Sequence, residues 1–427
     1  MIVHWLYTAI VRPILLYGNI VWWPSLDKNC NLRILHKIQR SAELCISGAL
    51  RTTATEALNT ILDLQPLDLL AKSWASATAL RLREAAAWTT GSTGHSNILS
   101  KHSPLPLYTD YVPPIVDFER RYKIYIPTRS DWDNLPHQFV SAVNIYTDGS
   151  RLNSQTGGGV FSPELDLKVS FRLPDHCSVF QAEVIAIQEA TTHLNTSVHQ
   201  DIDIFIFSDS QAALRALDSY TTSSKTISEC RKSLNEMATH LSINLIWVPG
   251  HLNIEGNCIA DELARQGTTA DILRDKDTVG MPMATCKLHL RQRLYTLSNN
   301  RWNSISTCHN SRLTWPNYNT KRTKTLLQCS RENISTLLNA LTGHCLIGTH
   351  AIRLGLSNHD FCRSCKQIDE EESIEHLLCF CPAHNLKRFQ TLGSYTLPNL
   401  AAIQDVSIQK LLCFLRKTEY FAKADNP

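Results

Sequence analysis

Four acidic residues occupy positions at which a carboxylate is unusual. Asp148 follows the apolar run "AVNIYT", Glu183 lies within "SVFQAEVIAIQEATTHL", Asp209 follows "DIDIFIFS", and Asp261 lies within "NCIADELA". Taken singly, each has an ordinary interpretation: Asp148 with Gly149 is a common hairpin turn, and Asp209 could cap a helix. If the four converge, their repulsion requires cations between them. Oxygen-only ligands select Mg²⁺ or Mn²⁺, and two such ions about 3.5–4 Å apart can activate water for phosphodiester hydrolysis.

A second group has the residue types of a zinc site. Cys362 and Cys365 form a C-x2-C pair, His376 follows after ten residues, and Cys381 follows after four more. Three thiolates and one imidazole suit tetrahedral Zn²⁺, and such a closed ligand set would be structural. Cys379 could replace Cys381, and the spacing alone prefers neither. The alternative is a set of reduced, buried cysteines without a metal.

Separate strands and helices carry the four carboxylates. "AVNIYTD" predicts a strand that ends at Asp148, and "GGGVFSP" with "LDLKVSFRL" predicts a hairpin after it. "DIDIFIF" predicts a buried strand with Asp209 just past its carboxyl end, where open α/β sheets place their binding sites. "INLIWV" predicts another strand, and Asp261 lies on a later helix that ends near Gly267. The sequence therefore predicts an α/β segment over residues 140–270.

The helix that contains Glu183 has a recognisable start. Ser178 and Gln181 have the spacing of a capping box. Glu183 shares one helix face with Ala186, Ile187 and other apolar residues at three- and four-residue spacing. A carboxylate on a buried face is costly unless something compensates its charge. The periodicity thus favours a functional role for Glu183 over a surface position.

Four motifs in this segment resemble, in order, those of the ribonuclease H family. They are "YTDGS", "FQAEVIAI", "FSDSQAAL" and "WVPGHLNIEGNCIADELA", and they cover about residues 142 to 268. The resemblance implies that Asp148, Glu183, Asp209 and Asp261 form the metal-binding quartet. It also implies that His251 is the family's mobile histidine, which assists proton transfer or product release.

Further positions match the family's substrate contacts. The resemblance implies that Gly149 and Ser150 lie near the RNA strand and that Gln181 contacts substrate. Some cellular members insert a basic, Trp-containing handle that grips the hybrid, between the helix after Asp209 and the next strand. This chain has one helix there, "SKTISECRKSLNEMATHL", and lacks the handle.

The resemblance implies a ribonuclease H-like fold with a mixed five-stranded sheet and flanking helices. Its first three strands would form an antiparallel meander. The implied activity is endonucleolytic hydrolysis of the RNA strand of RNA–DNA hybrids with two Mg²⁺ ions, or Mn²⁺ in their place. One alternative is a retroelement remnant that binds nucleic acid without cleaving it. Another is an integrase or transposase of the same fold, which the "PGH…GN…AD" spacing disfavours.

The flanking segments resemble parts of Jockey- and I-type non-LTR retrotransposon proteins. Residues 5 to 82, including "LYTAIVRPILLYGNIVWWPSL", are similar to the region after the reverse-transcriptase palm. No Asp-Asp pair occurs in the chain, so we expect no polymerase activity. "LTGHCLIGTHAIRLG" and "CRSCKQIDEEESIEHLLCFC" resemble the closing Cys/His segment of these elements, whose pattern prefers Cys381 as the fourth ligand.

Composition divides the chain into four regions. Residues 1–90 are predicted to be a helical, thumb-like remnant, and residues 91–139, rich in Ser, Thr and Pro, a linker or connection. Residues 140–270 are the predicted ribonuclease H domain. Residues 280–427 are predicted to be a basic helical region that contains the zinc-knuckle-like segment 362–381. The oligomeric state is not predicted.

The overall charge of +3 hides a partition. From Val140 to Ala270, fifteen Asp and Glu stand against eight Lys and Arg, a net of −7. From Thr278 to Arg331 there is no acidic residue, and the nine basic residues there are interleaved with aromatic ones. These are Lys287, Arg291, Arg293, Arg301, Arg312, Lys321, Arg322, Lys324 and Arg331. This stretch could grip the hybrid in place of the handle, with Arg322 and Lys324 as phosphate contacts, or it could be a solvated helix face.

The cysteines and the apolar N-terminal stretch indicate in which cellular compartment the protein is expected. Fourteen cysteines without the dense spacing of a secreted disulfide scaffold indicate a reducing, intracellular setting, nucleus or cytoplasm. The apolar opening "MIVHWLYTAIVRPILLYGNIVWW" is interrupted by His4, Arg12 and Pro13. We therefore expect a packed helix there and neither a membrane span nor a signal peptide.

Overall fold

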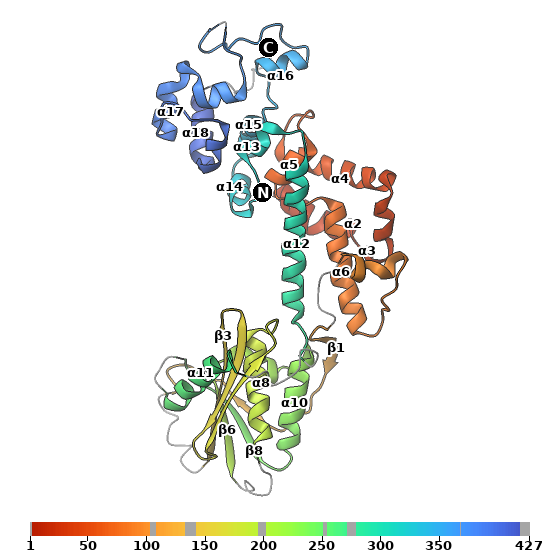
Figure 1. Cartoon of the computed structure of the whole chain (residues 1–427), viewed down its shortest axis with the longest axis vertical. Coiled ribbons are helices and arrows are strands. Elements are labelled where there is room, and N and C mark those ends of the chain that lie inside the picture. Colours follow the sequence, from red (N-terminus) through yellow and green to blue (C-terminus); the bar gives the residue numbers. More distant parts are fainter. Residues whose placement is uncertain are drawn as a thin grey trace. The chain divides into compact units, whose positions relative to one another are not determined.

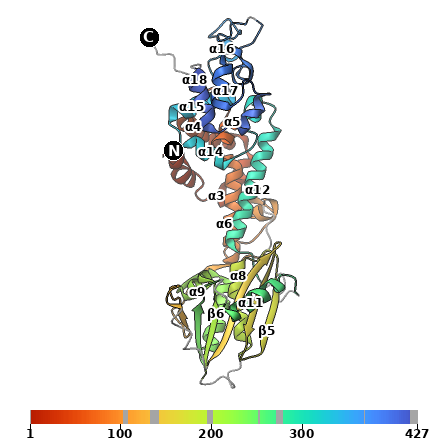
Figure 2. The same ribbon diagram turned by 90° about the vertical axis from the view of Figure 1, so that its left-hand side faces the viewer.

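The computed structural model describes residues 2–102, 108–132, 142–194, 202–250, 254–270, 279–367 and 369–418 (Figures 1 and 2). The chain forms two compact units. Unit 1 comprises Met1–Ser76, Thr93–Ile98 and Leu290–Pro427, and unit 2 comprises Ala77–Ser92 and Leu99–His289. Two helices, α6 (Leu67–Glu84) and α12 (Met283–Ser304), contribute residues to both units. The boundaries predicted from composition do not coincide with those of these units.

Unit 2 contains a mixed sheet of six strands in the order β2-β8-β6-β3-β4-β5. Strands β3 (Val143–Leu152), β4 (Gln155–Ser162) and β5 (Leu167–Leu173) form the predicted antiparallel meander. Strands β6 (Asp203–Ser208) and β8 (Ser242–Trp247) run parallel to β3, and both are apolar runs because each is covered on both faces. The predicted α/β fold class is confirmed.

The sheet has one strand more than the five we expected. The edge strand β2 (Lys123–Tyr125) pairs in parallel with β8, and it comes from the segment predicted to be a linker. A second short strand of that segment, β1 (Tyr111–Val116), pairs with β7 (Thr221–Ser224) in a separate two-stranded sheet. Strands of three residues have no readable alternation, so the sequence pattern did not predict β2.

Helices cover both faces of the large sheet. Helices α8 (Val179–Thr192), α9 (Gln211–Asp218) and α10 (Lys225–Met237) pack on the face that carries Ile145, Ile206 and Leu245. The next residue along β3 and along β6, Tyr146 and Phe207, points to the opposite face, as the period of a strand requires. Helix α11 (Glu255–Gly267) packs on that side, where Figure 1 shows it separated from α8 by the sheet.

The glycine run in β4 lets α11 approach the sheet closely. A Cβ atom at Gly157 would lie 2.4 Å from the carbonyl carbon of Gly267, and one at Gly159 would lie 2.4 Å from the carbonyl oxygen of Ala260. Neither distance is possible for a real side chain. Gly157 and Gly159 therefore allow close packing of the helix that carries Asp261, whereas a Cβ atom at Gly158 would meet the Phe171 ring.

Unit 1 is helical. Its N-terminal part contains α1 (Ile2–Leu6), η1 (Tyr7–Val11), α2 (Arg12–Leu15), α3 (Asn19–Trp22), η2 (Trp23–Asp27), α4 (Asn29–Ser47) and α5 (Thr55–Ile61). Its C-terminal part contains α13 (His309–Thr314), α14 (Thr320–Leu327), α15 (Arg331–Thr342), α16 (Gly348–Arg353), η6 (His376–Phe380), η7 (Pro382–His384), α17 (Asn385–Leu392), η8 (Leu400–Asp405) and α18 (Ile408–Thr418). The segment before β1 adds η3 (Gly94–Asn97) to unit 1, whereas α7 (Ile98–His102) belongs to unit 2 except for its first residue.

One core joins the two ends of the chain in unit 1. Leu58 and Ile61 of α5 are completely buried in the same cluster as Leu337 of α15 and Phe414 of α18. Residues far apart in sequence thus stabilise one another by burying apolar surface. Within the described part of the chain, no helix combines the length and the apolar character that crossing a membrane requires.

Candidate functional site

Three of the four predicted carboxylates meet at one place in unit 2. Oxygen atoms of Asp148, Glu183 and Asp209 all lie within 4.8 Å of one another. They come from three elements: strand β3, helix α8 and the residue that directly follows strand β6. Asp148 and Glu183 are each only 6% exposed, and Asp209 is partly buried. The convergence predicted from the sequence therefore exists for these three residues.

The register of two parallel strands brings Asp148 and Asp209 together. Thr147 of β3 is paired with Ser208 of β6, and each aspartate is the next residue. The Thr147 hydroxyl donates to the carbonyl oxygen of Phe207 at 3.0 Å, and the Trp247 indole N–H donates to that of Asp209 at 3.0 Å. These bonds fix the backbone at the carboxyl end of the sheet.

Asp148 is not a turn residue. Strand β3 continues past it to Leu152, and Asp148 is paired with Gly159 of β4. The hairpin turn lies at Asn153 and Ser154, whose φ angles of 48° and 67° are those of a type I′ turn. The predicted strand end at Asp148 was wrong by four residues, and the turn interpretation of this aspartate is excluded.

Glu183 is positioned by a cap and by a glycine. The capping box of Ser178 and Gln181 starts α8 as predicted. A Cβ atom at Gly149 would lie 2.7 Å from the backbone nitrogen of Glu183 and 3.0 Å from Cβ of Ala182. Only glycine lets β3 approach α8 this closely, so Gly149 brings the carboxylates of Asp148 and Glu183 together.

The predicted substrate contact of Gln181 is corrected by the structure. Gln181 is 1% exposed, and its amide donates to the carbonyl oxygen of Gly280 at 2.9 Å. It is a capping and packing residue, because a capping box turns the side chain back onto its own helix end. Gly149 and Ser150 lie beside Asp148 in β3 and are partly exposed.

The carboxylates of the cluster are largely buried and repel one another. Burial raises the pKa of Asp148 to about 7, and the nearby Asp209 and Asp261 carboxylates add to the shift. Burial is the main cause that raises the pKa of Glu183 well above its usual range, and the nearby Asp148 and Asp209 carboxylates add to the shift. A hydrogen bond from the Gly149 N–H opposes both shifts. Glu183 Oε2 is buried, and among the described residues it has no hydrogen-bond partner. This donor set fits a hard divalent cation.

Asp261 and His251 differ from the other predicted residues. Asp261 lies on α11 near enough to raise the pKa of Asp148 and Glu183, but its Oδ2 accepts from the Arg265 guanidinium at 2.7 Å. It is not within the 4.8 Å group. His251 lies outside the described residues.

One residue next to the cluster was not predicted from the sequence. It is Gly250, where a Cβ atom would come 3.0 Å from Asp209 Oδ2. The position of Gly250 in "VPGH", directly before His251, is the sequence feature that could have identified it.

A comparison with models of protein families finds a match to RNase H over residues 140–269. Residues 140–269 are an RNase H domain. The match covers the segment predicted from the four motifs and includes all three clustered carboxylates and Asp261. A comparison with curated proteins finds no match to the chain.

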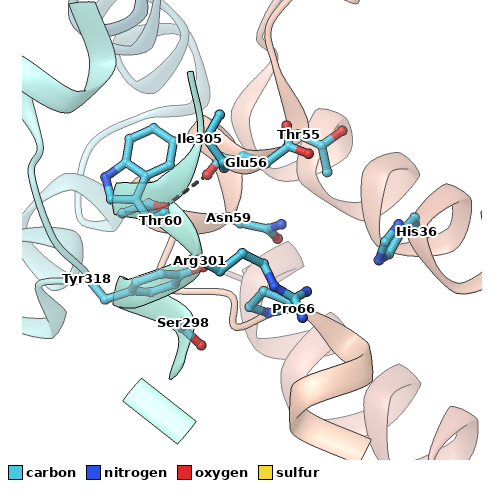
Figure 3. Close-up of a pocket in the computed structure, with 11 residues that line it drawn as sticks. His36, Thr55, Glu56, Asn59, Thr60, Pro66, Ser298, Arg301, Ile305 and Tyr318 are labelled. Carbon is cyan, nitrogen blue, oxygen red and sulfur yellow. Dashed lines mark hydrogen bonds between the residues drawn. The ribbon is translucent and has the colours of Figure 1, made fainter. Parts of the chain in front are cut away.

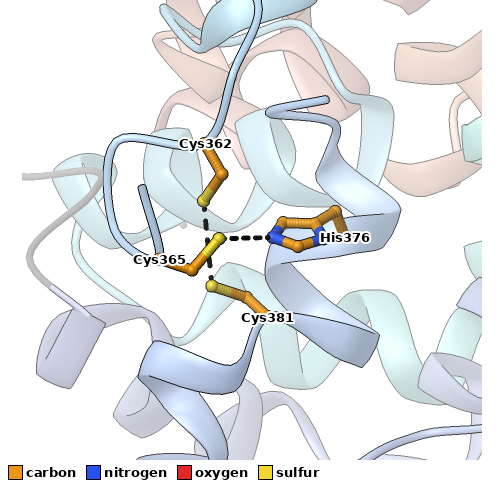
Figure 4. A group of neighbouring side chains, drawn as sticks. All are labelled: Cys362, Cys365, His376 and Cys381. Carbon is orange, nitrogen blue, oxygen red and sulfur yellow. Dashed lines mark hydrogen bonds between the residues drawn. The ribbon is translucent and has the colours of Figure 1, made fainter. Parts of the chain in front are cut away.

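The predicted zinc ligands lie together in unit 1, outside the RNase H domain. Cys362 Sγ lies 3.8 Å from Cys381 Sγ, and Cys365 Sγ lies 3.5 Å from His376 Nε2. Figure 4 shows the four side chains pointing toward one another. One ligand atom of each residue lies within 4.8 Å of the others. Of the two cysteines left open by the spacing, the group contains Cys381 and not Cys379. Glu370 Oε2 lies 3.1 Å from His376 Nδ1, where a carboxylate orients the imidazole of many zinc sites.

The Cys381 thiol ionises less readily than a free thiol, so a bound cation would favour its thiolate form. Burial raises the pKa of Cys381 to about 12, and the neighbouring Cys362 and Cys365 add to the shift. Zn²⁺ binds thiolates rather than thiols, and its charge would compensate the repulsion among them. The donor set of three sulfurs and one nitrogen therefore fits structural zinc.

The predicted phosphate contact of Arg322 is also corrected. Its guanidinium donates to the carbonyl oxygens of Thr314 at 3.2 Å and Ile403 at 2.8 Å, and it lies 4.6 Å from the Trp315 ring. Burial lowers its pKa. These groups leave Arg322 little capacity for a phosphate. Lys324, on the same helix, is exposed.

Arg301, another residue of the basic stretch, is structural as well. Its two terminal nitrogens donate to Asp68 at 2.8 and 2.7 Å. Figure 3 shows Arg301 and Tyr318 at the lining of a small pocket in unit 1. The pocket has a volume of about 50 Å³. It has room for water but not for a nucleotide.

Proposed function

We propose that the RNase H domain hydrolyses the RNA strand of RNA–DNA hybrids endonucleolytically, leaving a 5′-phosphate and a 3′-hydroxyl. The observation that carries this proposal is the cluster of Asp148, Glu183 and Asp209, three carboxylates within 4.8 Å at the carboxyl end of the parallel strands. Such a cluster is unfavourable without cations, and it occurs within the matched domain.

The cofactor we propose is a pair of Mg²⁺ ions, for which Mn²⁺ could substitute. When bound, the two ions would activate the attacking water and stabilise the leaving oxygen. Asp148 and Asp209 would contribute to holding both ions, and Glu183 would hold the ion on the leaving-group side. Asp261 would complete the nucleophile side, which requires it to leave its ion pair with Arg265.

Substrate would lie along the exposed part of β3. Gly149 and Ser150 directly follow the buried Asp148, so their backbone can contact the RNA strand next to the carboxylates. Contacts to the 2′-hydroxyl distinguish RNA from DNA. By resemblance to the family, His251 assists proton transfer or product release.

The decisive experiment is cleavage of matched duplexes by the purified chain with Mg²⁺. We expect cleavage of the RNA strand in an RNA–DNA hybrid and none in double-stranded RNA or DNA of the same sequence. Asp209→Asn is the control for contaminating nuclease and should be inactive. Equal cleavage by wild type and by Asp209→Asn would refute the proposal.

The wider context is proposed from the flanking segments. Their similarity to non-LTR retrotransposon proteins supports a retroelement origin, without polymerase activity. The Cys362, Cys365, His376 and Cys381 group supports a structural Zn²⁺ in unit 1. In this proposal unit 1 is a nucleic-acid-binding partner of the nuclease domain.

A further inference from the structure

Two aromatic side chains of unit 1 stack on one another at the protein surface. Phe389 of α17 and Tyr395 of the following loop have ring centroids 4.4 Å apart and planes 8° apart. They are nevertheless 45% and 54% exposed, and Leu386, one turn before Phe389, is 62% exposed. We call Leu386, Phe389 and Tyr395 the aromatic shelf. Because each ring covers one face of its partner, the exposed area includes the outer ring faces.

A buried arginine fixes the shelf in place. Arg388, the neighbour of Phe389, is completely buried. Its guanidinium donates to the carbonyl oxygens of Leu378 at 2.8 Å, of Cys381 at 3.2 Å and of Tyr395. The same guanidinium thus holds the backbone of the candidate zinc ligand Cys381 and the backbone of Tyr395. A surface fixed in this way loses little entropy when it binds a partner.

Exposed cations lie beside the shelf. The Lys417 ammonium of α18 donates to Gln390 Oε1, next to Phe389, at 3.2 Å. Lys410 lies two turns earlier on α18, on the same helix face, and both lysines are exposed. Unit 1 as a whole has 24 Lys and Arg against 15 Asp and Glu, a net of +9. Unit 2 has 18 against 24, a net of −6.

We propose that the aromatic shelf, with Lys410 and Lys417, binds single-stranded nucleic acid by stacking bases on the outer ring faces. Planar rings beside cations are the combination that recognises single strands without sequence preference, because every base has a π face and every linkage a charge. An apolar protein partner or a lipid surface would be bound through the apolar area of the shelf, and planar rings would not be required for that. The shelf contains no residue of the carboxylate cluster, so this proposal does not depend on RNA cleavage.

Fluorescence anisotropy with a labelled 15-nucleotide oligo(dT) tests the proposal on the full chain. DNA single strands are not substrates of the proposed reaction, so the probe persists. We expect F389A/Y395A to weaken binding by about tenfold or more, with an unchanged salt slope, because stacking releases no counterions. K410Q/K417Q should reduce the salt slope by about 1.4, at roughly 0.7 for each lost phosphate contact with a single strand.

Two further variants separate stacking from other causes. F389L/Y395L keeps apolar area but removes the rings, and it should lose affinity as the alanine variant does. F118A/Y220A changes another exposed aromatic pair, in unit 2, whose rings are tilted by 42°, and it should bind as wild type does. Cross-linking of a 5-iodouracil oligonucleotide should map to Tyr395 or Phe389 in the unaltered protein.

Three outcomes would overturn the proposal. The first is wild-type affinity in F389A/Y395A. The second is retained affinity in the leucine variant when the alanine variant has lost it, which would indicate apolar docking. The third is an equal loss in F118A/Y220A. Asp209→Asn should bind the probe normally, so failure of the cleavage proposal and failure of this one give different results.

Discussion

Asp148 is buried beside other carboxylates, and its pKa of about 7 lies above the 3.8 of an unperturbed aspartate. The metal-free folded state therefore binds a proton between these two values that the unfolded state releases. Stability without Mg²⁺ should fall as the pH rises from about 4 to 7 and level off above 7. A shift of this size corresponds to up to roughly 4 kcal/mol.

We expect Asp148→Asn to reduce this pH dependence, part of which remains because burial also raises the pKa of Glu183, and to abolish the nuclease activity. The amide has no proton to lose in this range, so the metal-free variant should be more stable than wild type at pH 8. Cleavage should fall by several orders of magnitude, because one of the clustered carboxylates is lost. Urea unfolding at pH 5 and pH 8 without added Mg²⁺, together with a cleavage assay, checks both. Near wild-type cleavage would contradict the catalytic assignment.

Gly149 offers a test of positioning that leaves every carboxylate in place. Gly149→Ala would put a methyl group 2.7 Å from the Glu183 nitrogen, so β3 and α8 must separate. We expect a loss of about 1–3 kcal/mol in the free energy of unfolding, with strongly reduced cleavage. Ser150→Ala, the next residue of the same strand, is the matched control and should retain stability. A fully stable and active Gly149→Ala protein would show that this close contact is unimportant.

At the scale of elements, the four candidate zinc ligands come from two places. Cys362 and Cys365 lie in a loop, His376 begins η6, and Cys381 directly follows η6. Cys381→Ser should lose about one equivalent of zinc and lower the thermal stability of unit 1. Cys379→Ser, two residues away and outside the ligand group, should keep the metal. Metal analysis of freshly purified, reduced proteins distinguishes the two. Zinc loss from the Cys379 variant alone would assign the fourth ligand to that residue.

Helix α14 carries two basic residues with different roles. Arg322→Ala removes hydrogen bonds to Thr314 and Ile403 and the contact with Trp315, and should destabilise unit 1 by about 1–3 kcal/mol. Lys324→Ala on the exposed face should leave the melting temperature nearly unchanged. Thermal unfolding measures both variants. A larger loss of stability for the Lys324 variant would contradict this division.

Much of the RNase H domain could be predicted because its signals are local. The apolar runs of β6 and β8 and the capping box at Ser178 each depend on a few adjacent residues. The sixth strand could not be predicted, because β2 is three residues long and forms through pairing with β8, which is distant in sequence. Likewise, nothing near Arg322 in sequence indicates that Ile403 accepts its hydrogen bond. Asp261 was predicted to join the cluster, but in the structure its carboxylate lies outside the group of three and pairs with Arg265, one turn later on the same helix.

At the scale of the whole molecule, the two compact units carry net charges of opposite sign, +9 for unit 1 and −6 for unit 2. Unit 1 collects basic residues from both ends of the chain, whereas unit 2 retains the acidic excess of the RNase H domain. An acidic catalytic unit repels a polyanionic substrate unless cations or a basic unit offset its field. The net charge of unit 1 therefore supports its proposed role as the nucleic-acid-binding part.

Unit 1 contains residues from both ends of the chain, so its core cannot form until late in translation. Leu58 and Ile61 must remain without their core partners on α15 and α18 until the whole of unit 2 has been translated. These helices begin at residues 331 and 408, so at roughly 5–20 residues per second the delay lasts about 15–70 s. During this time, unit 2 can fold while the apolar face of α5 is exposed on the nascent chain. Chaperone binding to the N-terminal segment would protect this apolar surface until α15 and α18 have been made.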